Sequence, residues 1–129
     1  MSRKAIYVLR IGLAVTFIWI GVLILRNPEA WGGYIKPWVV ELLPASVARI
    51  MIGTALLDII IGIGFLINPL VWWAALLGAV HLIMVLIGSG ITDITVRDIG
   101  LLAASLALLL SWPMPKFLKS ENNKVENNN

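Results

Sequence analysis

Three ionisable side chains lie inside long apolar segments of this 129-residue chain: Arg10, Asp58 and His81. A carboxylate and an imidazole that meet can share or transfer a proton, and a guanidinium can pair with the carboxylate. A charge at the centre of a bilayer costs on the order of 2.5–3.5 kcal/mol, so Asp58 needs a partner or must be protonated. We therefore predict one buried cluster of Arg10, Asp58 and His81. It is either a structural clamp between helices or a site for a ligand or a proton.

The other residue types narrow the classes of chemistry. The chain has no cysteine, which excludes disulfides, thiol relays, thiolate metal sites and covalent haem attachment. His81 is the only histidine, so a haem or metal site within one subunit has few ligands, and we predict no metal. No nucleophile elbow, phosphate-binding loop or zinc-ligand spacing occurs, and Gly62-Ile63-Gly64 is typical of close helix packing. The sequence therefore assigns no catalytic residue.

The segments that must position these residues are apolar enough to cross a membrane. The chain is 60% hydrophobic and 13% charged, whereas soluble domains are about half apolar and a quarter charged. Because a bilayer core takes about 20 apolar residues per helix, we predict an all-α membrane protein with a four-helix transmembrane bundle. The predicted spans are residues 5–25, 46–67, 70–88 and 92–112. They form a single domain over residues 1–115, and the polar tail, residues 116–129, is predicted to be disordered.

The segment between the first two spans mixes aromatic with charged residues. This composition is favoured at the headgroup region of a bilayer, so we predict a short helix and turns along the interface. Asn68-Pro69 leaves only a two-residue turn between the second and third spans, which makes them an antiparallel hairpin. The predicted interface anchors are Trp31, Tyr34 and Trp38 in the first segment, and Trp72 and Trp73 after the turn.

Small and polar residues recur at helical spacing along one face of each span. The predicted inner faces are Arg10, Ala14, Phe17 and Gly21; Thr54 or Ala55, Asp58 and Gly62; Ala74, Gly78, His81, Val85 and Gly88; and Arg97, Gly100, Ala104, Ala107 and Ser111. At about 1.5 Å per residue, Arg10 lies roughly 8 Å from the inner end of its helix and Asp58 about 13 Å, a gap that an arginine can bridge.

A second polar set is expected near the outer side of the bundle. Within it, Arg97-Asp98 is typical of a cap at the start of the fourth span, where an aspartate favours the helix N-terminus. The members of the set are Arg26, Arg49, Asp93, Arg97 and Asp98.

Basic residues lie at the ends of the spans instead of forming a patch, so the net charge of +3 predicts no nucleic-acid partner. Arg3, Lys4, Lys116, Lys119 and Lys124 fall at one end, which favours both termini inside the cell. The first span lacks a signal-peptidase site and is expected to be a retained helix.

Several motifs together resemble the DoxX family. They are R-I-G-L-A-V-T-F-I-W-I-G at 10–21, N-P-E-A-W-G-G-Y-I-K-P-W at 27–38, Gly53, Asp58 and Gly62 at their spacing, and R-D-I-G-L-L-A-A-S-L-A-L at 97–108. The resemblance implies a small four-helix protein of a bacterial or archaeal cytoplasmic membrane. One relative, DoxD, is the small subunit of a thiosulfate:quinone oxidoreductase. The family usually has glutamate where Asp58 stands, and often a lysine late in the first span, where this chain has Leu23-Ile24-Leu25-Arg26.

Two functions remain open from the sequence. The first is an accessory or anchor subunit of a membrane oxidoreductase assembly, in which Arg10, Asp58 and His81 bind a quinone. Such a chain is not catalytic alone and needs a soluble or membrane oxidoreductase partner, besides the lipid bilayer and a second copy of itself as a candidate homo-oligomer. The alternative is a membrane scaffold without a catalytic role, whose polar core only holds the helices together. A transporter is less favoured, because the broken inverted repeats that mark many transporters are missing.

Overall fold

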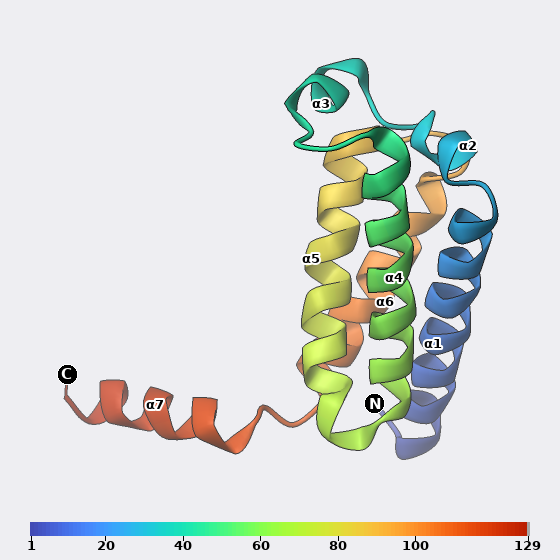
Figure 1. The fold of residues 1–129 in the computed structure, drawn as a ribbon. Helices are drawn as coiled ribbons and strands as arrows, with labels where there is room; N and C mark the ends of the chain where they lie inside the picture. The colour runs from blue at the N-terminus through green and yellow to red at the C-terminus, as the bar shows by residue number, and fades with distance from the viewer. Residues whose placement is uncertain (129) are drawn as a thin grey trace.

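The computed structural model describes residues 1–128, which form seven α-helices and one 3-10 turn and contain no strand. Four long helices pack side by side, and two short ones cross one end of them (Figure 1). The elements are α1 (Arg3–Arg26), α2 (Pro28–Gly32), α3 (Pro37–Leu42), α4 (Val47–Leu66), η1 (Asn68–Leu70), α5 (Val71–Ser89), α6 (Val96–Ser111) and α7 (Lys116–Asn127).

Three of these helices, α1, α4 and α5 extended by η1, are long and apolar enough to cross a membrane. The bent pair of α6 and α7, with 69° between them, would make a fourth crossing. The chain is therefore a small helical membrane protein with several spans. The short helices expected between the first two spans are α2 and α3, and the predicted hairpin of the second and third spans is α4 and α5.

Helices α1 and α4 approach each other closely because small residues line their contact. A Cβ atom added to Gly21 would lie 2.6 Å from Ile59 Cγ1 and 2.7 Å from the carbonyl oxygen of Ala55. A Cβ atom added to Gly62 would lie 2.6 Å from Ile18 Cγ1 and 3.0 Å from the carbonyl oxygen of Ala14. Such small-residue contacts are how helices associate in lipid, where apolar side chains gain nothing by leaving the solvent.

The apolar core fills the half of the bundle nearer η1. Phe17 and Phe65 lie there with ring centroids 5.7 Å apart, and both are almost fully buried. In the same half, α4 and α5 pack closely at two glycines. A Cβ atom added to Gly64 of α4 would lie 3.0 Å from Ala74 of α5, and one added to Gly78 of α5 would lie 3.4 Å from Ile61 of α4. The opposite half of the bundle therefore has more room between α4 and α5.

The segment between α1 and α4, which contains α2 and α3, is fastened to that opposite end. The side chain of Asn27 accepts a hydrogen bond from the N–H of Ala30 at 3.3 Å and so caps α2. The N–H of Lys36 donates to the carbonyl oxygen of Gly88 at 2.9 Å, which ties the segment to the last turn of α5. A second apolar cluster, formed by Ile24, Met51 and Ala55, packs against Trp31 and so holds α2 on the bundle.

Two local features differ from the sequence predictions. In the tail, Lys116–Asn127 form α7, which projects sideways from the bundle (Figure 1). This stretch contains no glycine or proline, and stacking of Phe117 on Trp73, with centroids 6.1 Å apart, anchors its start. The inner face of α6 also differs from the predicted one. Its buried residues are Asp98, Ser105 and Leu108, whereas Gly100 is exposed.

Candidate ligand site

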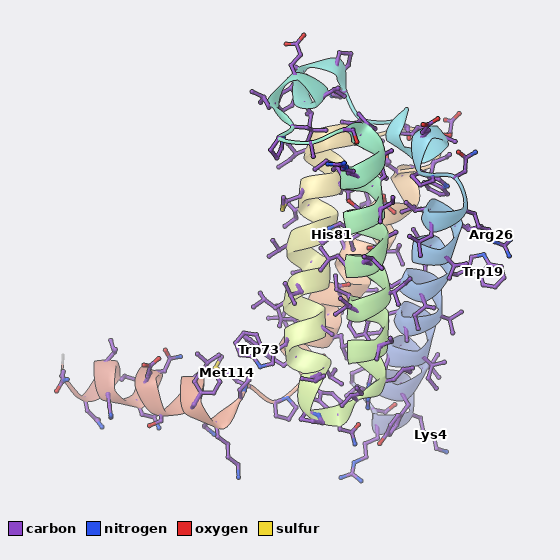
Figure 2. The ribbon with its side chains drawn as sticks, in the orientation of Figure 1. Lys4, Trp19, Arg26, Trp73, His81 and Met114 are labelled. Atoms are coloured by element: carbon purple, nitrogen blue, oxygen red, sulfur yellow. The ribbon has the colours of Figure 1, made fainter. Side chains whose placement is uncertain are left out.

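Asp58 and His81 form a close polar pair between α4 and α5. His81 Nε2 lies 3.0 Å from Asp58 Oδ1, and the two side chains are 10% and 6% exposed. Figure 2 places His81 in the half of the bundle that faces α2 and α3. At this distance the two side chains share a hydrogen, so the pair is a hydrogen bond that links two spans.

The pair lies in the wall of a cavity of about 440 Å³. Side chains of α1, α4, α5 and α6 line this cavity, and the segment with α2 and α3 covers it. Most of the lining is apolar, as in typical small-molecule pockets of roughly 300–1,000 Å³. The polar lining side chains are Tyr34, Thr54, Asp58, His81, Ser89, Thr95, Arg97 and Asp98.

Arg97 and Asp98 bring a second charge pair into the same cavity. Asp98 is buried in the first turn of α6, and its Oδ1 lies 3.8 Å from Arg97 Nε. The guanidinium of Arg97 also lies over the ring of Trp31, 5.6 Å from its centroid. A cation over an aromatic face is attracted by the ring quadrupole, so this contact holds α2 against α6. The cavity thus contains two carboxylates, one guanidinium and one imidazole.

Arg10 does not join Asp58, and this part of the predicted cluster was wrong. Its Nε donates to the carbonyl oxygen of Phe65 at 2.9 Å, and its guanidinium lies 4.8 Å from the ring centroid of Trp112 and 5.4 Å from that of Tyr7. Phe65 follows Asp58 by roughly 10 Å along α4, at about 1.5 Å per residue. Phe65 lies in the last turn of α4. Carbonyl groups in the last turn of a helix have no hydrogen-bond donor within that helix. Arg10 therefore stabilises the C-terminus of α4 with hydrogen bonding and positive charge.

The predicted outer polar set divides into two groups. Arg97 and Asp98 lie in the cavity, and Asp98 takes the predicted place in the first turn of α6. The other three, Arg26, Arg49 and Asp93, are exposed and do not line the cavity. Figure 2 shows Arg26 pointing outward from the end of α1.

The predicted anchors lie at both ends of the bundle. Trp38 and Tyr34 are 53% and 37% exposed in the covering segment, while Trp31 is half-buried against the second apolar cluster. Trp72 and Trp73 lie at the other end in an edge-to-face contact with centroids 4.9 Å apart. Trp31 and Tyr34 also line the cavity, a role that the sequence did not indicate.

The polar atoms of the cavity are accessible or paired. Among residues 1–128, the buried side-chain polar atoms without a hydrogen-bond partner are Arg10 Nη1 and Ser105 Oγ, and neither residue lines the cavity. The remaining polar atoms of Asp58 and His81 can therefore bond a molecule that enters. In the same part of the chain, no three His, Asp or Glu side chains are placed to hold a metal ion.

The sequence placed Gly88 on the inner face of its span and Gly53 in a motif, but it did not indicate that either glycine leaves open space in a cavity. Gly53 and Gly88 line the cavity, and a Cβ atom added to either would meet nothing within 4 Å. The spacing of Gly53, Asp58 and Gly62 was visible in the sequence, but it did not distinguish Gly62, which permits helix contact, from Gly53, which leaves space.

Comparison of the chain with family models, curated proteins and solved structures finds no match. The resemblance to the DoxX family therefore stays a prediction that depends on the motifs quoted above.

Proposed function

We propose that this chain is a four-span, DoxX-like protein of a prokaryotic cytoplasmic membrane whose cavity binds the headgroup of a quinone. In this proposal both termini face the cytoplasm, α6 is the fourth span, and the chain serves as an accessory or anchor subunit of an oxidoreductase assembly. The observation that carries the proposal is the Asp58–His81 pair in the wall of a mainly apolar cavity. An apolar pocket with a few convergent polar groups is the usual form of a small-molecule site.

The residues of the cavity match the needs of a quinone ring. A quinone carbonyl accepts hydrogen bonds, and His81 and Arg97 can donate them from neighbouring walls of the cavity. Apolar side chains such as Phe17, Leu57 and Leu101 provide surfaces for the ring. When bound, the quinone would supply the redox chemistry, and the electrons would come from a partner subunit. Asp58 would hold the imidazole of His81 in orientation, and the proton shared by the two side chains would lie beside the ring.

A second candidate function is a membrane scaffold whose polar pairs are only structural. The observation in its favour is the same 3.0 Å pair, because it links α4 to α5 where close glycine contacts between the two helices are absent. In that case Asp58 would contribute to stability and the cavity would have no specific occupant.

Purification of the full chain in mild detergent, followed by mass spectrometry of bound lipids and proteins, separates the two functions. We expect a quinone and an oxidoreductase subunit to co-purify with the unaltered chain. Asp58→Asn should lose the quinone while the protein stays inserted, and Asp93→Asn, at an exposed acid outside the cavity, should keep it. If neither a quinone nor a redox partner co-purifies, and Asp58→Asn lowers only the amount or stability of the protein, the scaffold function is correct.

A further inference from the structure

We propose that the occupant of the cavity is an amphipathic, lipid-like molecule whose hydrocarbon chain leaves sideways into the bilayer between α4 and α5. This inference depends on the proposed function and specifies the class of ligand and its route of entry. Contacts within the protein close the other sides of the cavity.

Three sides are closed by named contacts. On the side of α2 and α6, the Arg97 guanidinium covers the Trp31 ring at 5.6 Å. At the end of the bundle, the hydrogen bond from the Lys36 N–H to the Gly88 carbonyl oxygen fastens the covering segment to α5. Toward the core, the close approach of Gly78 to Ile61 brings α5 against α4.

A fourth closure separates α1 from α4. There Gly21 lies so near the Ala55 carbonyl that an added Cβ would be only 2.7 Å from its oxygen. No chain can pass between backbones at that separation. Helices α5 and α6 pack against each other more extensively than α4 and α5 do. The side left without a closing contact is the one between α4 and α5, beyond Gly78 toward α3.

Between α4 and α5, several side chains contact both the cavity and the exterior of the protein. Leu77, Val80 and Met84 line the cavity and are also 47%, 47% and 65% exposed. Opposite them on α4, Gly53 is exposed, lines the cavity, and has nothing within 4 Å of an added Cβ. Because these residues belong to membrane-crossing helices, the exterior that they face is lipid.

The position of the opening suits a molecule with a polar head and an apolar chain. Gly53 precedes Asp58 by five residues, roughly 7.5 Å along α4, so a ring at the Asp58–His81 pair would place its chain beside Gly53. The charged groups then contact the head, and leucine, valine and methionine side chains contact the chain. A small polar molecule without a chain would leave this opening unused.

The test compares a quinone with a chain and one without, using the full chain in lipid nanodiscs. Decylubiquinone has the hydrocarbon chain, and duroquinone is a ring without one. Gly53→Leu fills the opening, while Gly12→Leu is the matched control. Gly12 is also exposed on a spanning helix, and an added Cβ there meets nothing within 4 Å, but it does not line the cavity.

We expect Gly53→Leu to weaken decylubiquinone binding about tenfold, because roughly two methylene groups lose their place, and to leave duroquinone binding within about twofold. Gly12→Leu should change neither. Equal weakening of both quinones by Gly53→Leu, or no weakening of either, overturns the lateral route while the proposed function stands if the unaltered protein binds them.

A second measurement does not need a quinone. The chain lacks cysteine, so a nitroxide label on Gly53→Cys is the only label in the protein. A label at this lateral opening should collide with molecular oxygen from the lipid and be protected from a water-soluble nickel chelate. Collision mainly with the chelate would mean that the opening faces water, and would overturn the route even if quinone binding is observed.

Discussion

Replacing the two members of the Asp58–His81 pair, singly and together, should show that the pair acts as one energetic unit. Leucine is a suitable replacement for both, because it is apolar and the adjoining cavity can accept its bulk. His81→Leu leaves a carboxylate that is 6% exposed without its partner. Asp58→Leu leaves an imidazole that is 10% exposed without its hydrogen-bond partner.

The expected magnitudes follow from this burial. Removing one partner of a buried ion pair costs about 3–5 kcal/mol, so His81→Leu should lower the free energy of unfolding by that amount. Asp58→Leu should cost less, about 1–3 kcal/mol, because the neutral imidazole loses only a hydrogen bond. The double replacement leaves no unpaired group and should cost far less than the sum, which gives a coupling energy of at least about 2 kcal/mol.

The assay is reversible unfolding in mixed micelles, followed by far-ultraviolet circular dichroism, for the four proteins of the cycle. Asp93→Leu combined with His81→Leu is the control, because Asp93 is exposed and outside the cavity, and its effect should simply add. If the Asp58 and His81 effects add to within about 0.5 kcal/mol, the two side chains do not interact in the membrane protein and the geometry of the site is refuted.

Three further changes have defined outcomes. Arg10→Met should lower the free energy of unfolding by about 1.5–3 kcal/mol, because it removes the bond to the Phe65 carbonyl, yet leave quinone binding unchanged; a loss of binding would contradict its place outside the cavity. Gly62→Leu should destabilise the α1–α4 contact by more than about 2 kcal/mol, whereas Gly100→Leu, with open space around it, should stay within about 0.5 kcal/mol in the same unfolding assay. Truncation after Pro115 should remove the circular dichroism signal of the 12 helical residues of α7, and an unchanged total helical signal would contradict that helix.

Much of the bundle was predictable because helical periodicity and membrane hydrophobicity act on each span independently. The spans predicted at 5–25 and 46–67 correspond to α1 (Arg3–Arg26) and α4 (Val47–Leu66). Along α1, Ala14, Phe17 and Gly21 are buried as expected from their spacing. A small-residue stripe therefore predicts which face of a helix turns inward.

The relation between two helices is harder to predict from one sequence. Depths counted from helix ends brought Arg10 within reach of Asp58. The contacts of Gly62 with Ala14 and Ile18 set the actual register of α1 against α4, and they place Arg10 beside the last turn of α4. Nothing in the spacing of residues within either helix fixes that register.

The inner face of α6 was mispredicted for a different reason. Small residues such as Gly100 and Ala104 were taken to face inward, yet Asp98 and Ser105 do so. Asp98 lies in the first turn of α6, where its carboxylate faces the cavity beside Arg97 of the same helix. The position of the first turn of α6 against the cavity, which the small-residue pattern does not encode, therefore sets which face of this helix turns inward.

The most direct test of the central claim is photoaffinity labelling with an azidoquinone that has a hydrocarbon chain, applied to the full protein in nanodiscs. The account predicts adducts in residues 50–58 and 77–88, which face each other across the cavity, and their loss when excess decylubiquinone is added. Adducts confined to other segments, or adducts that excess decylubiquinone does not displace, would contradict a quinone site at Asp58 and His81.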